Sequence, residues 1–350
     1  MTHSIEINKR AIGVGFPVYI IAELSANHNQ DFNQAVQLVH AAKAVGADAV
    51  KVQTFTADTL TMRSNKEYFL VKDGTPWNGR MLYDLYREAS MPWDWQPKLK
   101  VIANELGLDF FSTAFDSSSV DFLEKMNVPA YKVASFELVD IPLIQKIAQT
   151  KKPLILSTGM ATFDEIKEAV DAARNAGAKQ IALLKCTSAY PASPKEMNLR
   201  VIPDMSKAFG VPVGLSDHTL CSVVATTAIA LGACIVEKHL TLSRRTSGLD
   251  SKFSLEPAEF KELVQAIRLV ETTFGAPKYA ATDGEKGCLT FRRSLFVVKD
   301  MKDGDKFTYD NLRSIRPAFG LSPKYLNSVI GKKAKKNIDE GTPLTWELVA

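Results

Sequence analysis

The fold is decided by a stretch that contains three apolar runs, AYKVASF (130–136), PLILST (153–158) and IALLKCT (181–187). Each run is apolar over about five residues, which is typical of parallel strands buried on both faces. The amphipathic segment FDEIKEAVDAARNAG (163–177) separates the second run from the third. This order of strand, helix and strand predicts parallel strands joined by helical crossovers.

The same alternation extends on both sides of this stretch. The further apolar runs are VYIIAEL (18–24), AVKVQTF (49–55), DFFSTAF (109–115), PVGLSD (212–217) and CIVEKHL (234–240). Helical patterns separate the runs, and the last one, at 257–275, follows the eighth run. Eight strands that alternate with eight helical segments predict a (β/α)8 TIM barrel. A doubly wound sheet is the alternative, and the lack of a glycine-rich dinucleotide fingerprint favours the barrel.

The chain has 350 residues, so a barrel of about 250 residues leaves room for one small domain. We place the barrel at 1–275, a linker at 276–290 and a small, mostly β domain at 291–350. In the small domain, SLFVV (294–298) and TPLTWELV (342–349) have the composition of strands.

The net charge of +4 is unevenly distributed. Residues 285–350 carry 13 Lys and Arg against 8 Asp and Glu, whereas residues 1–284 carry 30 against 31. A basic tail raises the alternative of a nucleic-acid-binding or ice-binding module beside an inert barrel. The lysines at 332, 333, 335 and 336 have no ladder of aromatic residues for base stacking, so we expect no nucleic-acid partner.

The composition also limits the location of the protein. No apolar run approaches the ~18 residues that cross a bilayer, and the first residues lack the apolar core of a signal peptide. The four cysteines show no CxxC spacing. We therefore expect a cytoplasmic protein without a membrane partner.

One interval between strands is longer than the others. The second and third runs begin 60 residues apart, and the insert at 56–95 holds three of the four tryptophans. Two interpretations stay open: the insert lines a site or an interface, or it packs over the barrel wall.

Polar residues follow nearly every predicted strand, where a barrel carries its active site. Lysines at 51, 132, 185 and 238 lie inside apolar runs, where an ammonium group is costly unless it is paired. With nearby Ser and Thr hydroxyls, they suit a phosphate or carboxylate substrate. For Lys185 and Lys238, an outward position or a structural ion pair is an equal alternative.

His218 and His239 end the seventh and eighth strands, which are neighbours in a barrel. Two imidazoles on adjacent strands can hold a divalent ion and leave positions for water and substrate. Glu23 and Asp250 are candidates for completing the metal shell or for acid and base catalysis.

These residues lie in strings through which the chain resembles the sialic acid synthase family. The strings are IAELSANHNQ, KVQTF, FSTAFD, YKVASFEL, LSTGMAT, LLKCTSAYP, GLSDHT and EKHLTL. The family condenses phosphoenolpyruvate with an aminosugar to make nonulosonic acids. FRRSLFV, IRPAFGL and IGKKAKKNI resemble the family's C-terminal antifreeze-like (SAF) β-clip domain.

The resemblance implies a role for individual residues. His218 and His239 correspond to the ligands of Mn²⁺, with Mg²⁺ or Co²⁺ as alternatives. Glu23 corresponds to the acid beside the reacting carbons, and Asp250 to the carboxylate that meets the aminosugar. The residues that correspond to the phosphoenolpyruvate site are Lys51, Thr113, Lys132, Ser135, Ser157, Ser188, Tyr190 and Ser216.

The tail also takes part in the site that the resemblance implies. Arg316 corresponds to an arginine that the SAF domain donates to the partner's site in a domain-swapped homodimer. Phe291 corresponds to an aromatic residue that shapes the sugar pocket.

Three segments resemble most the branch that makes pseudaminic acid, and they are AELSANHNQ, LYDLYREASMPWDW and the region of SRRTSGLDSKFSLEP. This implies a 6-deoxy-2,4-diacetamido acceptor of the altrose type. Ser188 stands where N-acetylneuraminate synthases typically carry Asn, and the run at 243–247 also departs from the family pattern. An N-acetylneuraminate or legionaminate synthase with an N-acetylmannosamine-type acceptor is the alternative.

Overall fold

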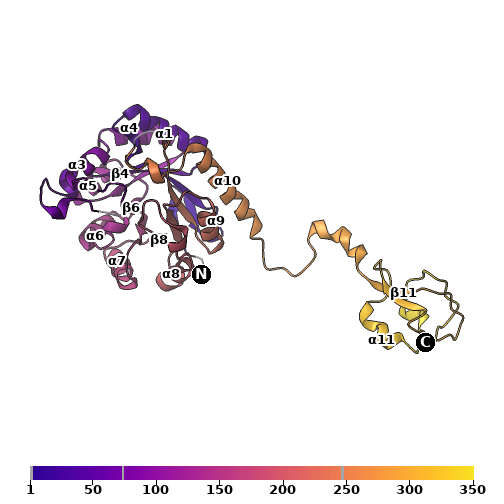
Figure 1. Cartoon of the computed structure of the whole chain (residues 1–350). Helices are drawn as coiled ribbons and strands as arrows, with labels where there is room; N and C mark the ends of the chain where they lie inside the picture. The colour runs from indigo at the N-terminus through magenta and orange to yellow at the C-terminus, as the bar shows by residue number, and fades with distance from the viewer. Residues whose placement is uncertain (1–2, 73–74, 246–247) are drawn as a thin grey trace. The chain divides into compact units, whose positions relative to one another are not determined.

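Eight parallel strands close into a barrel, and a ring of helices surrounds them (Figure 1). This computed structural model describes residues 3–72, 75–245 and 248–350. The hydrogen-bonded order around the barrel is β10-β3-β4-β5-β6-β7-β8-β9. The predicted TIM barrel is therefore confirmed, and the doubly wound alternative is wrong.

The barrel strands coincide with the eight apolar runs. They are β3 (Tyr19–Glu23), β4 (Ala49–Thr54), β5 (Asp109–Ala114), β6 (Tyr131–Val133), β7 (Leu154–Ser157), β8 (Ile181–Cys186), β9 (Val213–Asp217) and β10 (Ile235–His239). Nearly all of their residues are buried, because the outer faces of the strands pack on helices and the inner faces fill the barrel.

A helix follows each strand of the barrel. These helices are α1 (Phe32–Ala44), α4 (Trp95–Glu105), α5 (Ser117–Lys125), α6 (Ile141–Gln149), α7 (Phe163–Asn175), α8 (Val201–Phe209), α9 (Val223–Ala230) and α10 (Pro257–Thr273). Several begin at a side-chain cap; for example, Thr162 accepts from the Glu165 N–H while the Glu165 side chain accepts from the Thr162 N–H. Such caps end the strand-to-helix loops at defined residues and so fix the loops that carry the site.

The insert between β4 and α4 contains α2 (Ala57–Leu60), the 3₁₀ helix η2 (Glu67–Phe69) and α3 (Leu82–Ala89). Its tryptophans divide between the two interpretations. Trp93 packs on Phe122 of α5 with ring centroids 4.8 Å apart, which covers the barrel wall. Trp77 instead lines a cavity at the mouth of the barrel, and its Nε1 donates to the Leu249 carbonyl at 3.1 Å.

A hairpin that the sequence did not predict precedes the barrel. Its strands, β1 (Ser4–Ile7) and β2 (Arg10–Gly13), are antiparallel. Asn8 Nδ2 donates to Asp109 Oδ1 at the start of β5, so the hairpin lies at the end of the barrel opposite the carboxyl ends of the strands.

The chain divides into two compact units, Met1–Gly275 and Ala276–Ala350. The expected linker contains part of the 3₁₀ helix η6 (Asp283–Phe291). Within the second unit, β11 (Ser294–Val297) pairs with β12 (Leu312–Ile315), around an apolar core of its own.

The strand expected at 342–349 is wrong. This run contains the 3₁₀ helix η8 (Trp346–Leu348) and joins its neighbours only through single bridges at Pro343 and Val349. The turn of 3₁₀ helix interrupts the extended backbone and limits the pairing to these bridges. Within the described part of the chain, no helix is both long enough and apolar enough to span a membrane.

Candidate active site

Strand register brings the candidate residues together at the carboxyl ends of the barrel strands. Glu23 lies opposite Lys51 on β4 and opposite His239 on β10. The cavity at this point, here called the inner chamber, measures about 50 Å³. Its lining is Glu23, Lys51, Gln53, Thr113, Lys132, Ala134, Ser135, Phe136, Ser157, Cys186, Tyr190, Ser216, His218, Glu237 and His239.

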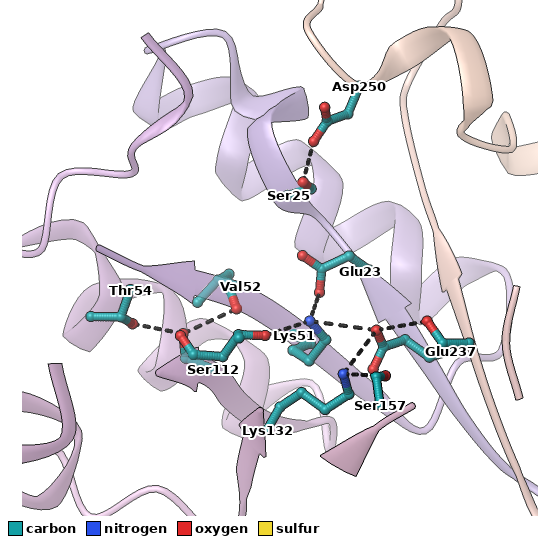
Figure 2. A network of polar contacts seen from close by, with 12 residues as sticks. Glu23, Ser25, Lys51, Val52, Thr54, Ser112, Lys132, Ser157, Glu237 and Asp250 are labelled. Carbon is teal, nitrogen blue, oxygen red and sulfur yellow. Dashed lines mark hydrogen bonds and ion pairs between the residues drawn. The ribbon is translucent and has the colours of Figure 1, made fainter. Parts of the chain in front are cut away.

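Two buried lysines form the centre of the inner chamber (Figure 2). Lys51 Nζ lies 2.5 Å from Glu23 Oε2 and donates to Thr113 Oγ1 at 2.8 Å. Lys132 Nζ donates to Ser157 Oγ at 2.7 Å. Each ammonium group therefore contacts hydroxyl oxygens as well as carboxylates, which is the environment that an anionic ligand requires.

Glu237 connects the two lysines (Figure 2). Its Oε1 lies 3.6 Å from Lys51 Nζ and 3.8 Å from Lys132 Nζ, and Ser216 Oγ donates to the same oxygen at 3.4 Å. No individual role was predicted for Glu237 from the sequence. Its place two residues before His239, on the same face of β10, was the available signal.

The carboxyl groups of Glu23 and Glu237 differ in acidity. Burial raises the pKa of Glu23 to about 7, although Lys51 acts in the opposite direction. Burial acts in the same sense on Glu237, but the ammonium groups of Lys132 and Lys51 outweigh it and hold the pKa of Glu237 below its usual value. The chamber thus combines a carboxyl group that can carry a proton near neutral pH with one that stays ionised.

The two histidines lie side by side, with ring centroids 5.3 Å apart. His218 Nδ1 is 3.0 Å from the Thr187 carbonyl oxygen, so Nε2 is the ring nitrogen that could bind a metal ion. His239 Nδ1 is buried without a hydrogen-bond partner in the described part of the chain, and burial holds the pKa of this imidazole well below its usual range. Two such imidazoles fit a divalent cation that also takes water and substrate.

The candidate metal site has few protein ligands. Across residues 3–72, 75–245 and 248–350, no group of three His, Cys, Asp or Glu side chains is placed to hold a metal ion. Cys186 lies beside His218. Burial raises the pKa of the thiol and lowers the pKa of the imidazole, but the hydrogen bond between the two side chains acts in the opposite direction. As a result, the pKa of Cys186 falls to about 7 and the pKa of His218 rises. A bound cation would displace the proton from His218.

The loop after β7 holds the serine hydroxyls close together. The Gly159 N–H donates to Ser135 Oγ at 3.1 Å. A Cβ at this glycine would lie 2.2 Å from Ser188 Oγ and 2.7 Å from Ser135 Oγ. Only glycine therefore allows both hydroxyls to approach this turn.

A second cavity, the outer chamber, adjoins the inner chamber and measures about 300 Å³. Gln53, Ala134, Phe136, Tyr190 and His239 line both. The remaining lining of the outer chamber is Ser25, Phe55, Leu60, Val71, Trp77, Leu82, Leu85, Tyr86, Ala89, Phe115, Glu137, Leu249, Asp250 and Phe253. Aromatic and aliphatic side chains dominate it, with a few polar groups that can orient a ligand.

Asp250 lies in the wall of the outer chamber, 8 % exposed. Ser25 Oγ donates to its Oδ2 (Figure 2). The Ala26 N–H donates to the same oxygen at 3.3 Å. Burial raises the pKa of Asp250 although these hydrogen bonds oppose it. Residues 246–247 of the run that precedes Asp250 lie outside the described residues.

Lys185 and Lys238 do not line the inner chamber. Lys238 forms a fully buried ion pair with Asp217, with Nζ and Oδ2 2.6 Å apart, so the structural alternative holds for it. Lys185 Nζ donates to the Cys186 carbonyl at 2.7 Å and is half-buried. The cationic side chains of the chamber are therefore those of Lys51 and Lys132, together with any charge on the histidines.

Phe291 and Arg316 belong to the second unit, Ala276–Ala350. Both are exposed, and Arg316 makes no ion pair with the residues that the structure describes. Gln53 and Glu137 belong to the polar residues that the sequence places at strand ends, but no individual role was predicted for either of them.

A closed barrel whose strand ends carry buried lysines, acidic groups and paired imidazoles defines an enzyme with a site for an anionic substrate. The family model described as the NeuB family matches residues 38–279, and that of the SAF domain matches residues 292–350. The chain belongs to the NeuB family and is a phosphoenolpyruvate-dependent nonulosonic acid synthase with a C-terminal SAF domain.

Known relatives cover nearly the whole chain. A pseudaminic acid synthase from Helicobacter pylori is 43% identical over 334 residues, which are 94% of this chain and 97% of that protein. An N,N'-diacetyllegionaminic acid synthase from Legionella pneumophila is 37% identical over 96% of this chain and 95% of its own. The crystal structure of the spore coat polysaccharide biosynthesis protein SpsE from Bacillus subtilis is 31% identical, covers 99% of both chains and has a TM-score of 0.67.

Proposed function

We propose that this enzyme is a pseudaminic acid synthase. In this reaction, phosphoenolpyruvate condenses with a 2,4-diacetamido-2,4,6-trideoxy hexose of the altrose type and water, giving pseudaminic acid and phosphate. The observation that carries the proposal is the pairing of an inner chamber that holds two buried lysines with a larger, mostly apolar outer chamber. The first suits phosphoenolpyruvate, and the second suits a sugar that carries three methyl groups.

Lys51 and Lys132 hold the phosphate and carboxylate of phosphoenolpyruvate in this proposal. The nearby hydroxyls that complete the cradle are those of Thr113, Ser135, Ser157, Ser188, Tyr190 and Ser216. Binding of the anion replaces the contacts that the lysines make with Glu23 and Glu237. The chain thus contributes mainly positioning and charge stabilisation.

The electrons of the enol double bond form the new C–C bond with the aldehyde carbon of the open-chain sugar, whose oxygen gains a proton. Water then adds to the resulting cation at C2 and loses a proton. The C–O bond to phosphate breaks last and leaves the ketone. Glu23 and Asp250 are the groups that we assign to proton transfer and to orienting water, because both are buried and have raised pKa values.

His218 and His239 are the residues that would hold the metal ion, for which we propose Mn²⁺ with Mg²⁺ or Co²⁺ as substitutes. When bound, the cation supplies Lewis-acid polarisation of the sugar carbonyl. Family members generally depend on a metal, and the donor set of two imidazoles agrees with this requirement.

We also propose a domain-swapped homodimer, in which Arg316 of one subunit reaches the outer chamber of the other and Phe291 shapes the sugar pocket. The exposure of both side chains in the second unit supports it. The positive charge of the tail then serves a small-molecule site.

Phosphoenolpyruvate labelled with ¹⁸O at the bridging oxygen tests the reaction. The label is expected in the released phosphate, because the C–O bond breaks; recovery in the sugar acid would contradict the mechanism.

Lys132→Met should lower kcat/KM for phosphoenolpyruvate by about 100-fold or more, since it removes a charge-assisted contact. Lys185→Met is the matched control, because this lysine also ends a strand but does not line the chamber.

A further inference from the structure

One face of helix α3 is turned toward the outer chamber. Leu82, Leu85, Tyr86 and Ala89 all line the cavity and follow the spacing i, i+3, i+4, i+7, which places them on one side of a helix. The other side of the helix carries charged residues, such as Asp84. The insert therefore presents a defined apolar surface to the cavity.

Leu60 and Val71 extend this surface. Leu60 ends α2, and Val71 is fixed by two backbone hydrogen bonds, from its own N–H to the Arg80 carbonyl at 2.8 Å and from the Gly79 N–H to its carbonyl at 2.9 Å. We call Leu60, Val71, Leu82 and Leu85 the apolar wall. Leu60, Val71 and Leu82 are half-buried, so their side chains remain accessible from the cavity.

Polar groups of the outer chamber lie elsewhere. Asp250, Glu137 and Gln53 come from strand ends and loops of the barrel proper. Trp77 Nε1 is already used by the Leu249 carbonyl. A hydroxyl group against the apolar wall would therefore lose its hydrogen bonds to water, and Tyr86 is the one polar side chain among the described insert residues lining the cavity that could replace one of them.

The position of the wall relative to the chemistry determines which part of the sugar it meets. The reacting aldehyde must lie at the inner chamber, near His239, which lines both cavities. None of the four wall residues lines the inner chamber. The wall consequently faces the end of the acceptor that is remote from the aldehyde.

We propose that the apolar wall selects acceptor sugars whose terminal carbon is a methyl group and rejects those that carry a hydroxyl there. This inference rests on the proposed function and assigns its sugar specificity to an insert helix. An apolar pocket discriminates against an added hydroxyl by about 100-fold at most, so we expect a preference of about 10-fold to 100-fold.

The test uses two 2,4-diacetamido sugars that differ only at C6, one deoxy and one hydroxylated, with the ratio of their kcat/KM values as the readout. Val71→Thr keeps the side-chain shape and adds a hydroxyl partner, and Leu82→Gln adds an amide. Each is expected to lower the ratio by about 10-fold, chiefly by improving use of the hydroxylated sugar. Met62→Ser is the matched control, because Met62 lies in the same insert but is 61% exposed and does not line the cavity.

An unchanged ratio in both wall variants, with the melting temperature of the wild type, would overturn the inference and leave the proposed function intact. Absence of turnover with either sugar in the wild type would instead contradict the proposed function. In that case, equilibrium binding of the same two sugars tests the selectivity of the apolar wall. Equal or tighter binding of the hydroxylated sugar would overturn the inference.

Discussion

Glu137 has a partly buried carboxyl group whose ionised form destabilises the folded protein. It lines the outer chamber, and its Oε2 is buried without a hydrogen-bond partner among the residues described. Burial raises its pKa from 4.5 to about 7. A carboxyl group in this setting can meet an N–H or O–H of the acceptor, at the expense of the stability of the free enzyme.

The cost of Glu137 should depend on pH with a definite sign. Between about pH 4.5 and 7 the folded protein keeps a proton that the unfolded chain releases, so the free energy of unfolding falls as pH rises and the full loss is present above pH 7. Glu137→Gln removes this loss. At pH 8 the variant should be more stable than the wild type by about 1–3 kcal/mol, and at pH 5 the difference should be clearly smaller, below about 1 kcal/mol.

Melting temperatures at both pH values measure this effect. Glu168→Gln, on an exposed position of α7, is the control and should show no such change between the two pH values. A stability difference for Glu137→Gln that is the same at pH 5 and pH 8 would contradict the assignment.

The loop between β7 and α7 is the element that holds the serine cradle. Gly159→Ala should raise KM for phosphoenolpyruvate by about 10-fold or more, because the new Cβ displaces Ser135 and Ser188, and small displacements of binding groups are costly. Stability should change little, because Gly159 does not have a positive φ. Gly284→Ala, whose Cβ would meet nothing within 4 Å, is the control. Unaltered KM in Gly159→Ala would show that the cradle does not bind this substrate.

Elements were predictable from the sequence where burial on both faces leaves an apolar run, as in all eight barrel strands. Strand-end positions follow from the barrel, so Lys51, Lys132, His218 and His239 could be predicted from the sequence alone. The role of the insert could not be predicted in this way. Trp77 and Trp93 are alike in the sequence, but Trp77 lines the cavity and Trp93 packs on the barrel wall. At 342–349 the apolar pattern favoured a strand, but the 3₁₀ helix Trp346–Leu348 interrupts the run and leaves only single bridges in it.

The sequence also did not show which charged side chains form pairs with one another. Lys132 and Lys238 look alike as lysines in apolar runs, yet one side chain lies in the barrel and the other forms a pair with Asp217 outside the chamber. Successive side chains of a strand point to opposite faces, so the two lysines can be distinguished only when it is known which face of each strand points into the barrel. Glu237 gained its importance from two lysines that come from different strands, a relation that no linear spacing carries.

At the scale of the whole molecule, the proposed dimer predicts complementation between inactive subunits. Arg316→Ala and Lys132→Met should each abolish most activity alone. After unfolding and refolding as a mixture, about a quarter of the sites should be active, because each mixed dimer has one barrel with Lys132 that receives an intact Arg316 from its partner. No recovery, with mixed dimers present by native mass spectrometry, would show that Arg316 acts within its own subunit or not at all.

The central claim is that this barrel makes pseudaminic acid, and a competition experiment tests it most directly. Phosphoenolpyruvate, Mn²⁺ and equal amounts of the 6-deoxy-2,4-diacetamido altrose and N-acetylmannosamine are incubated with the full chain, and the products are quantified by mass spectrometry. We predict that the 6-deoxy-diacetamido nonulosonic acid is formed in large excess, with one phosphate released for each molecule. Product from N-acetylmannosamine alone would contradict the account.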